Sequence, residues 1–205
     1  MKMKHIFEQG KPGNERVLLL LHGTGGTEKD LLPVASMIDP DASVLSVRGN
    51  ILESGMPRFF KRLREGVFDE EDLIIRTREL NEFLTEAADA YDFDRNKVVA
   101  IGYSNGANIA GSLLFHYEKS LEGALLFHPM VPRRGIQLPV QKGLPVFIGA
   151  GENDPICPAQ ETVDLKQMLE EAGAQVTDHW ERSGHQLTES EVKAGRDWYE
   201  THLIQ

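Results

Sequence analysis

The stretch Val98-Val99-Ala100-Ile101-Gly102-Tyr103-Ser104-Asn105-Gly106 decides the fold of this chain. Its first four residues form an apolar run typical of a buried strand, and residues 107–114 continue with small and apolar residues at helical spacing. Between them lies Gly-x-Ser-x-Gly, the pattern of a sharp strand-to-helix turn. The glycines let strand and helix approach closely, while the strained turn lifts the serine hydroxyl above the sheet. The pattern therefore predicts that Ser104 is an exposed nucleophile.

Apolar runs alternate with helical patterns on both sides of this turn. We predict strands at residues 17–21, 43–47, 98–103, 123–128, 145–149 and 175–181, and helices at 30–37, 70–91, 105–118, 158–172 and 189–202. Strands that are apolar on both faces and alternate with helices predict an α/β fold, with a mostly parallel central sheet and helices on both faces. No repeat, low-complexity tract or Pro/Ser-rich linker interrupts the chain, so we expect a single domain over residues 1–205.

Composition narrows the class of protein. The 205 residues suit one α/β domain with a sizeable core, and a net charge of −10 argues against nucleic acid or an anionic membrane as the main partner. The amino-terminal residues begin basic but have no apolar segment of the kind found in signal peptides, and the longest apolar runs are strand-sized. The one cysteine, Cys157, excludes an internal disulfide. We therefore expect a cytoplasmic protein that binds neither nucleic acid nor membrane.

A nucleophilic serine needs a general base, and the base needs an orienting carboxylate. In a fold of this kind the order along the chain is Ser, then Asp or Glu, then His. Asp154 lies just past the strand predicted at residues 145–149, where parallel sheets gather their ligands. Asp154 is the predicted acid, and its alternative role is that of a turn former before Pro155. The competing carboxylates are Glu152, Asp164 and Asp178.

The predicted base is His185. It follows the strand predicted at residues 175–181, and Gly184 allows a tight turn there. The competitor is His128, which precedes Pro129 at another strand end. Four other histidines lie near the terminus or inside periodic segments, where a packed or solvated imidazole is the usual outcome: His5, His116, His179 and His202.

A site for the developing oxyanion follows the first predicted parallel strand. The segment Leu21-His22-Gly23-Thr24-Gly25-Gly26-Thr27 matches the His-Gly-x-Gly-Gly type of loop, which donates a backbone N–H to a tetrahedral intermediate. We assign one donor to the Thr24 amide and the second to the amide of Asn105, the residue after the nucleophile. His22 is interpreted as a residue that shapes the loop.

With these residues assembled, the chain resembles the α/β-hydrolase superfamily and, within it, the phospholipase/carboxylesterase family that includes acyl-protein thioesterases. The shared motifs are Leu21-His22-Gly23-x-Gly25-Gly26, Gly102-Tyr103-Ser104-Asn105-Gly106, Gly151-Glu152-Asn153-Asp154-Pro155 and Gly184-His185. The segments Arg48-Gly49-Asn50-Ile51-Leu52-Glu53 and Gly55-Met56-Pro57-Arg58-Phe59-Phe60 resemble the bacterial carboxylesterase branch related to hydroquinone-inducible hydrolases. The resemblance implies an α/β-hydrolase fold with no large cap domain, an open site for ester or thioester bonds, and triad roles for Ser104, Asp154 and His185. It also implies a homodimer.

The connection formed by residues 48–70 has little periodicity, and a connection of this length is usually functional. It carries Met56, Phe59, Phe60 and Phe68, which we predict to form one wall of the substrate pocket; the alternative is that these side chains tether the loop to the body.

The same connection holds a basic cluster of Arg58, Lys61, Arg62 and Arg64. Ion pairing with the acids at residues 69–72, or simple solvation, is the favoured interpretation, and attraction of an anionic substrate is the alternative. Cys157 lies outside the serine turn, so we expect a small buried side chain rather than a nucleophile.

Together these features predict a serine carboxylesterase acting on small-molecule esters with short-to-medium acyl groups through an acyl-enzyme on Ser104. The mechanism requires no metal or organic cofactor. Alternatives with the same triad are a thioesterase, a lysophospholipase and a lactone hydrolase, because the triad does not identify the leaving group. A non-catalytic ligand-binding relative is the alternative from a different class.

Overall fold

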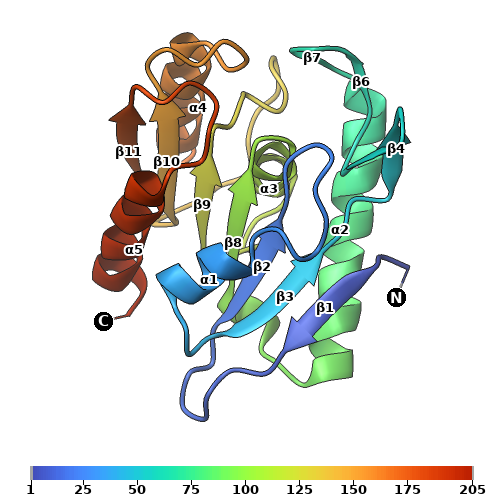
Figure 1. Cartoon of the computed structure of the whole chain (residues 1–205), viewed down its shortest axis with the longest axis vertical. Helices are drawn as coiled ribbons and strands as arrows, with labels where there is room; N and C mark the ends of the chain where they lie inside the picture. Colours follow the sequence, from blue (N-terminus) through green and yellow to red (C-terminus); the bar gives the residue numbers. More distant parts are fainter. Residues whose placement is uncertain (1, 205) are drawn as a thin grey trace.

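The structure is a computed structural model and describes residues 2–204. Its centre is a seven-stranded sheet in the order β1-β3-β2-β8-β9-β10-β11 (Figure 1). Six strands are parallel, and β1 pairs antiparallel with β3 at one edge. The strand bounds are β1 His5–Glu8, β2 Val17–Leu21, β3 Ser43–Val47, β8 Val98–Tyr103, β9 Gly123–Phe127, β10 Pro145–Gly151 and β11 Gln175–Glu181. The predicted mostly parallel sheet is confirmed, and β1 is the strand that the sequence pattern did not indicate.

Five α-helices cover both faces of the sheet, as predicted. Residues of α2, α3 and α4 pack in one apolar cluster with Leu19 and Leu21, while residues of α1 and α5 pack in the other with Leu18 and Leu20. This alternation along β2 follows from the two-residue side-chain period of a strand, and it explains why the strand is apolar throughout. The helices are α1 Leu32–Ile38, α2 Glu70–Tyr91, α3 Asn105–His116, α4 Ala159–Glu171 and α5 Glu189–Leu203, with a short 3-10 turn at Arg95–Lys97.

Polar caps fix where the two longest helices begin. Asp69 precedes α2, and its side chain accepts a hydrogen bond from the Asp72 amide at 3.1 Å. Thr188 and Glu191 form a capping box at the start of α5, each side chain bonding the other residue's backbone N–H. Such caps satisfy the free amides of a first helical turn. The α5 cap also fixes Glu191 close to the loop that carries His185.

The connection between β3 and α2 folds into two small hairpins. The first pairs β4 (Ile51–Glu53) with β5 (Met56–Arg58), and the second pairs β6 (Arg62–Arg64) with β7 (Val67–Phe68). The Gly25 amide donates to the Pro57 carbonyl at 2.9 Å, so the first hairpin is bonded to the glycine loop after β2. No large cap domain is inserted among residues 2–204, and none of the helices described there is long and apolar enough to cross a membrane.

The glycines of the serine turn are required by close contact. A Cβ atom on Gly106 would lie 1.9 Å from the Leu21 carbonyl oxygen, and one on Gly102 would lie 2.6 Å from the Gly106 oxygen. Both distances are far below van der Waals contact, and the obstructing atoms are backbone. The spacing of the two glycines therefore reflects the meeting of β8, α3 and β2.

We expect Gly106→Ala to be severely destabilising, by about 3 kcal/mol or more, because strand β2 or helix α3 must shift to admit the methyl group. Urea unfolding followed by circular dichroism measures the loss. Gly111→Ala is the matched control on the same helix, since its Cβ would meet side-chain atoms alone, the nearest being Pro132 Cγ at 3.2 Å. Equal stability of the two variants would contradict the close-approach argument.

Candidate active site

Ser104 lies between β8 and α3 in a strained backbone conformation. Its φ of 52° and ψ of −114° are unusual for a residue with a side chain. Its amide donates to the Phe127 carbonyl of β9 at 2.9 Å, which holds the turn against the neighbouring strand. The predicted turn is therefore present, with the serine at the carboxyl end of the parallel sheet.

His185 meets Ser104 as predicted. Its Nε2 lies 2.8 Å from Ser104 Oγ, and its Nδ1 lies 2.7 Å from Asp154 Oδ2. Because a carboxylate accepts, Nδ1 carries the proton, and Nε2 is the acceptor for the serine hydroxyl. The loop that carries the ring is held by Tyr103, whose hydroxyl donates to the His185 carbonyl. The hydrogen bonds thus run from Ser104 through His185 to Asp154.

Asp154 is buried and accepts hydrogen bonds on both oxygens. Oδ1 accepts from the amides of Ile156 and Cys157 at 2.8 and 2.9 Å. Burial alone would raise the pKa of Asp154, but the Cys157 amide and the His185 ring oppose it, and the pKa lies below its ordinary value. The competing carboxylates lie elsewhere: Glu152 is exposed, Asp164 pairs with Arg134, and Asp178 pairs with Lys166.

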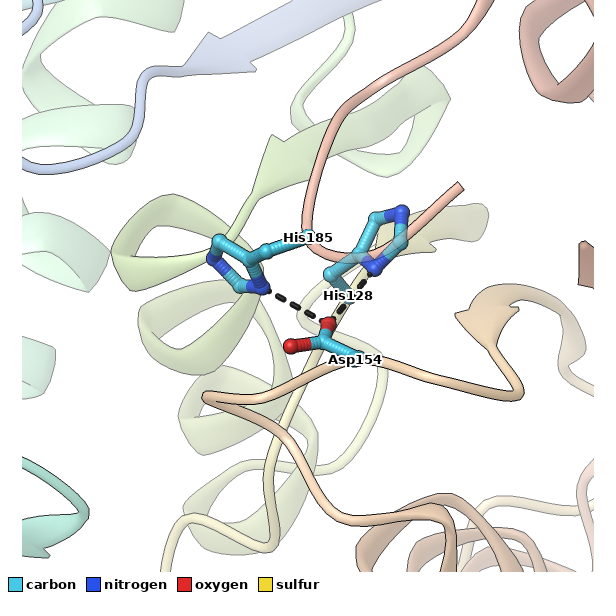
Figure 2. Close-up of side chains that lie close together, drawn as sticks. All are labelled: His128, Asp154 and His185. Atoms are coloured by element: carbon cyan, nitrogen blue, oxygen red, sulfur yellow. Dashed lines mark hydrogen bonds and ion pairs between the residues drawn. The ribbon is translucent and has the colours of Figure 1, made fainter. Parts of the chain in front are cut away.

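A second histidine contacts the same carboxylate. His128 Nδ1 lies 2.9 Å from Asp154 Oδ2, and the rings of His128 and His185 both approach that one oxygen (Figure 2). On its other side His128 Nε2 lies 3.1 Å from Glu191 Oε2 and 3.0 Å from Oε1. The sequence marked His128 only as a competing base, and Glu191 was not singled out. The capping-box spacing of Thr188 and Glu191 indicated a helix start but no contact with a histidine 63 residues away.

The pair of carboxylates changes the protonation of His128. Burial lowers the pKa of His128, but the hydrogen bonds and charges of Glu191 and Asp154 outweigh burial, and the pKa lies above its ordinary value. Each ring nitrogen faces a carboxylate, so each donates a proton. The two carboxylates therefore favour the protonated form of His128 more than water favours that of a free histidine.

This shift makes the stability of the fold depend on pH. A group whose pKa is raised by folding contributes stability below its unfolded pKa, here 6.5, and loses that contribution as pH rises through the folded value. We expect His128→Asn to lower the free energy of unfolding by about 3 kcal/mol near neutral or acidic pH and by less in alkaline solution. Urea titrations at about pH 6 and pH 9 measure the two penalties. Equal penalties would show that the His128 charge does not contribute.

His128, Asp154 and His185 are also side chains of the types that bind metal ions, and their ligand atoms lie within 4.8 Å of one another. The same atoms form the hydrogen bonds just described. A metal bound to both Nδ1 atoms would displace the proton that orients His185 toward Ser104, so the observed geometry suits proton transfer rather than metal ligation.

The two predicted oxyanion donors border the same pocket as Ser104. Thr24 and Asn105 both line it, and neither of their N–H groups donates in the backbone hydrogen bonds of the described turns and loops. Their side chains bind elsewhere: Thr24 Oγ1 accepts from Arg58 Nη1, and Asn105 Oδ1 accepts from the Phe59 amide at 2.7 Å. His22 Nε2 accepts from the Gly49 amide at 3.0 Å, consistent with a residue that shapes the loop.

The pocket in front of Ser104 has a volume of about 280 Å³. Its apolar wall contains Phe68, Met130, Ile156 and Cys157, and its polar side contains Arg58, Arg62, Glu65 and Asn108. Three residues of the predicted wall, Met56, Phe59 and Phe60, are not among the residues that line this pocket. Phe59 and Phe60 are completely buried in the core beside α2, and Met56 is exposed and lies beside Gly25. Of the four predicted side chains of this connection, Phe68 borders the pocket.

The basic cluster divides between pocket and solvent. Arg62 forms two 3.0 Å hydrogen bonds to Glu53, a partner that was not predicted, while Lys61 and Arg64 are exposed. Arg58 is buried beside Thr24, and burial and the charge of Arg62 lower its pKa to about 10. For Arg58 and Arg62, the predicted pairing with acids at 69–72 is replaced by pairing with Glu53 in the preceding hairpin. The exposed Lys61 and Arg64 fit the predicted solvation.

Comparison with known proteins shows the family to which this chain belongs. The profile of the Dienelactone hydrolase family matches residues 65–198. The hydrolase MhqD of Bacillus subtilis (strain 168) is 58% identical over 202 residues, which cover 98% of this chain and 100% of MhqD. Acyl-protein thioesterase 1 of Cryptococcus neoformans is 27% identical over 75% of this chain and 72% of that protein. The crystal structure of a carboxylesterase from Bacillus cereus superposes with a TM-score of 0.97 at 65% identity, covering 98% of this chain and 95% of that one.

Proposed function

Because this chain belongs to the dienelactone hydrolase family of α/β-hydrolases, we propose that it is a serine carboxylesterase that forms an acyl-enzyme on Ser104. The observation that carries the proposal is the hydrogen-bond sequence from Ser104 Oγ to His185 and from His185 to Asp154, at 2.8 and 2.7 Å. The likeness to a carboxylesterase structure favours oxygen esters. Cys157 does not compete as nucleophile, because burial raises the pKa of its thiol above the ordinary value and the thiol donates a hydrogen bond to the His128 carbonyl.

Acyl transfer follows from this geometry in two halves. As Ser104 Oγ attacks the ester carbonyl carbon, its proton passes to His185 Nε2, and the carbonyl oxygen becomes an oxyanion facing the amides of Thr24 and Asn105. When the carbon–oxygen bond to the alcohol breaks, the alcohol takes the proton from His185. A water then gives its proton to His185 and attacks the acyl-enzyme, and the proton returns to Ser104 Oγ as the acid leaves. Asp154 stabilises the imidazolium in both halves.

The pocket supports short-to-medium acyl groups. A volume of about 280 Å³ beside Ser104 is small for a ligand site, and its apolar wall holds only a few side chains. Thioester, lysophospholipid and lactone substrates remain alternatives because the triad chemistry is shared, and the likeness to a thioesterase extends over 75% of this chain. A non-catalytic binding protein would not need the hydrogen bonds that join Ser104 to His185 and His185 to Asp154.

A panel of p-nitrophenyl esters from acetate to decanoate tests the proposal, with matched thioesters and lactones alongside. We expect kcat/KM to be highest for short-to-medium oxygen esters. Phe68→Ala should move the optimum to longer acyl chains, because it enlarges the apolar wall. Leu63→Ala is the matched control: Leu63 belongs to the same hairpin but is 72% exposed and outside the pocket lining. An unchanged optimum in Phe68→Ala would refute this assignment of the acyl site, and absence of turnover would favour a binding protein.

The proposal includes a cytoplasmic location and a homodimer. The free, buried Cys157 supports a reducing compartment. The dimer is supported by the family resemblance, and light scattering at micromolar concentration measures it.

A further inference from the structure

The acid of the proposed triad is held by more groups than His185 alone. Asp154 accepts four hydrogen bonds: two from backbone amides on Oδ1, and two from the rings of His185 and His128 on Oδ2. A carboxylate that met only His185 on Oδ2 could tilt with that ring. The second ring holds the same oxygen from another direction (Figure 2).

His128 is itself clamped on two sides. Its ring is 1% exposed, and its nitrogens face Asp154 and Glu191, whose side chains are 1% and 0% exposed. Two carboxylates buried without a cation would be costly, whereas an imidazolium between them leaves one net negative charge for three groups. Two further rings contact that of His128: those of His185 and Tyr103, with ring centres at 5.3 and 6.1 Å, and neither adds a formal charge when His185 is the neutral base. The Cys157 thiol donates a hydrogen bond to the His128 carbonyl at 3.3 Å, on the backbone of that residue.

The backbone holds this clamp in a strained but defined position. His128 has a φ of 55°, and its amide donates to the Gly149 carbonyl of β10 at 2.8 Å. Glu191 belongs to the capping box of α5, and the cap residue Thr188 follows His185 by three residues. The start of α5 therefore positions Glu191 and anchors the His185 loop at the same place. A non-glycine residue persists at positive φ only where its surroundings determine it.

We propose that His128, clamped between Asp154 and Glu191, is a positioning residue that holds the Asp154 carboxylate in the orientation His185 needs for acyl transfer. This inference rests on the proposed esterase function. His128 touches neither Ser104 nor a substrate in this arrangement; it acts through Asp154. Glu191 acts one step further away, by keeping the second proton on the His128 ring.

Two conservative variants test the clamp. Glu191→Gln preserves the capping box, which accepts glutamine at this position, but removes the charge that retains the His128 proton. We expect its kcat to fall about tenfold at pH 8.5 and to approach the wild-type value at about pH 6, where His128 regains its proton, with KM unchanged throughout. His128→Asn suits the positive φ, and its kcat should be about 10- to 100-fold lower at both pH values. Glu189→Gln, an exposed change in the same helical turn, is the control and should match wild type.

A spectroscopic measurement follows His128 without any turnover. In protein labelled with ¹⁵N-histidine, we expect both ring nitrogens of His128 to be protonated at pH 8 in wild type and only one in Glu191→Gln. The positioning role would be overturned if Glu191→Gln kept the wild-type kcat at both pH values and His128→Asn were folded and fully active. The proposed function would stand in that case. A single ring proton on His128 at pH 8 in wild type would overturn the clamp. A wild-type protein that hydrolyses no ester overturns the proposed function and, with it, this inference.

Discussion

Ser104→Ala should lower kcat/KM on the preferred p-nitrophenyl ester by about four to six orders of magnitude, while the protein stays folded. The expectation follows from the loss of the hydroxyl that is hydrogen-bonded to His185 Nε2 at 2.8 Å, because the remaining groups act as a unit with the nucleophile. Alanine fits the turn as well as serine does, since the methylene carbon is kept. Initial rates measured over substrate concentration give both kcat and KM.

Ser36→Ala is the matched control for this variant. Ser36 is exposed on α1, where its hydroxyl donates to the Leu32 carbonyl at 3.2 Å, far along the chain from the serine turn. We expect its kcat/KM to equal that of wild type. Full activity of Ser104→Ala would show that another group, such as the thiol of Cys157, is the nucleophile.

Asp154→Asn should lower kcat by about 10⁴-fold with a smaller change in KM. The asparagine side chain keeps the shape of Asp154 but has one acceptor oxygen instead of two. In the wild type, Oδ2 by itself accepts from two imidazole rings, so the amide cannot satisfy every N–H donor around it. One ring must then turn or change its tautomer, and the His185 nitrogen facing Ser104 ceases to be a base. The same steady-state assay measures the loss, and circular dichroism checks the fold.

Glu152→Gln is the matched control for the acid. Glu152 lies in the same loop, is exposed, and faces only Arg182 at 3.6 Å. A surface pair of this kind contributes little, so the variant should keep wild-type activity. Were Asp154→Asn to retain a tenth or more of wild-type kcat, Asp154 would not be the orienting carboxylate.

The sheet and the meeting of Ser104, His185 and Asp154 were predictable because both follow from local patterns. Strands β2, β8 and β10 are apolar on both faces, and this pattern indicates a parallel sheet covered by helices. The carboxyl ends of such strands meet at one edge, so the loops after β8, β10 and β11 were expected to bring Ser104, Asp154 and His185 together. The structure places them within hydrogen-bonding distance.

The hairpins between β3 and α2 were missed because their strands are only two or three residues long and lack a regular apolar alternation. One signal was present in the sequence: the dipeptide Ser54-Gly55, which is typical of turns. Ser54 and Gly55 both have positive φ, at 51° and 81°, which is the conformation of a two-residue hairpin turn.

The direction of the aromatic side chains in this connection could not be deduced from their spacing. Phe59 and Phe60 pack into the core beside α2, whereas Phe68 borders the pocket, and burial of large rings drives all three inward from different points of the chain. His128 and Glu191 pose the same difficulty. Their contact joins residues from two loops of the sheet edge, and only the three-dimensional arrangement of β9, β10 and α5 reveals it.

The central claim is that Ser104 carries the acyl group, and labelling with a fluorophosphonate tests it most directly. Intact mass spectrometry should show one adduct per chain, and peptide mapping should place that adduct on Ser104, with ester hydrolysis lost in proportion to labelling. The Ser104→Ala protein should remain unlabelled. A wild-type protein that hydrolyses esters while Ser104 stays unmodified, or that carries the adduct on another residue, would contradict the claim.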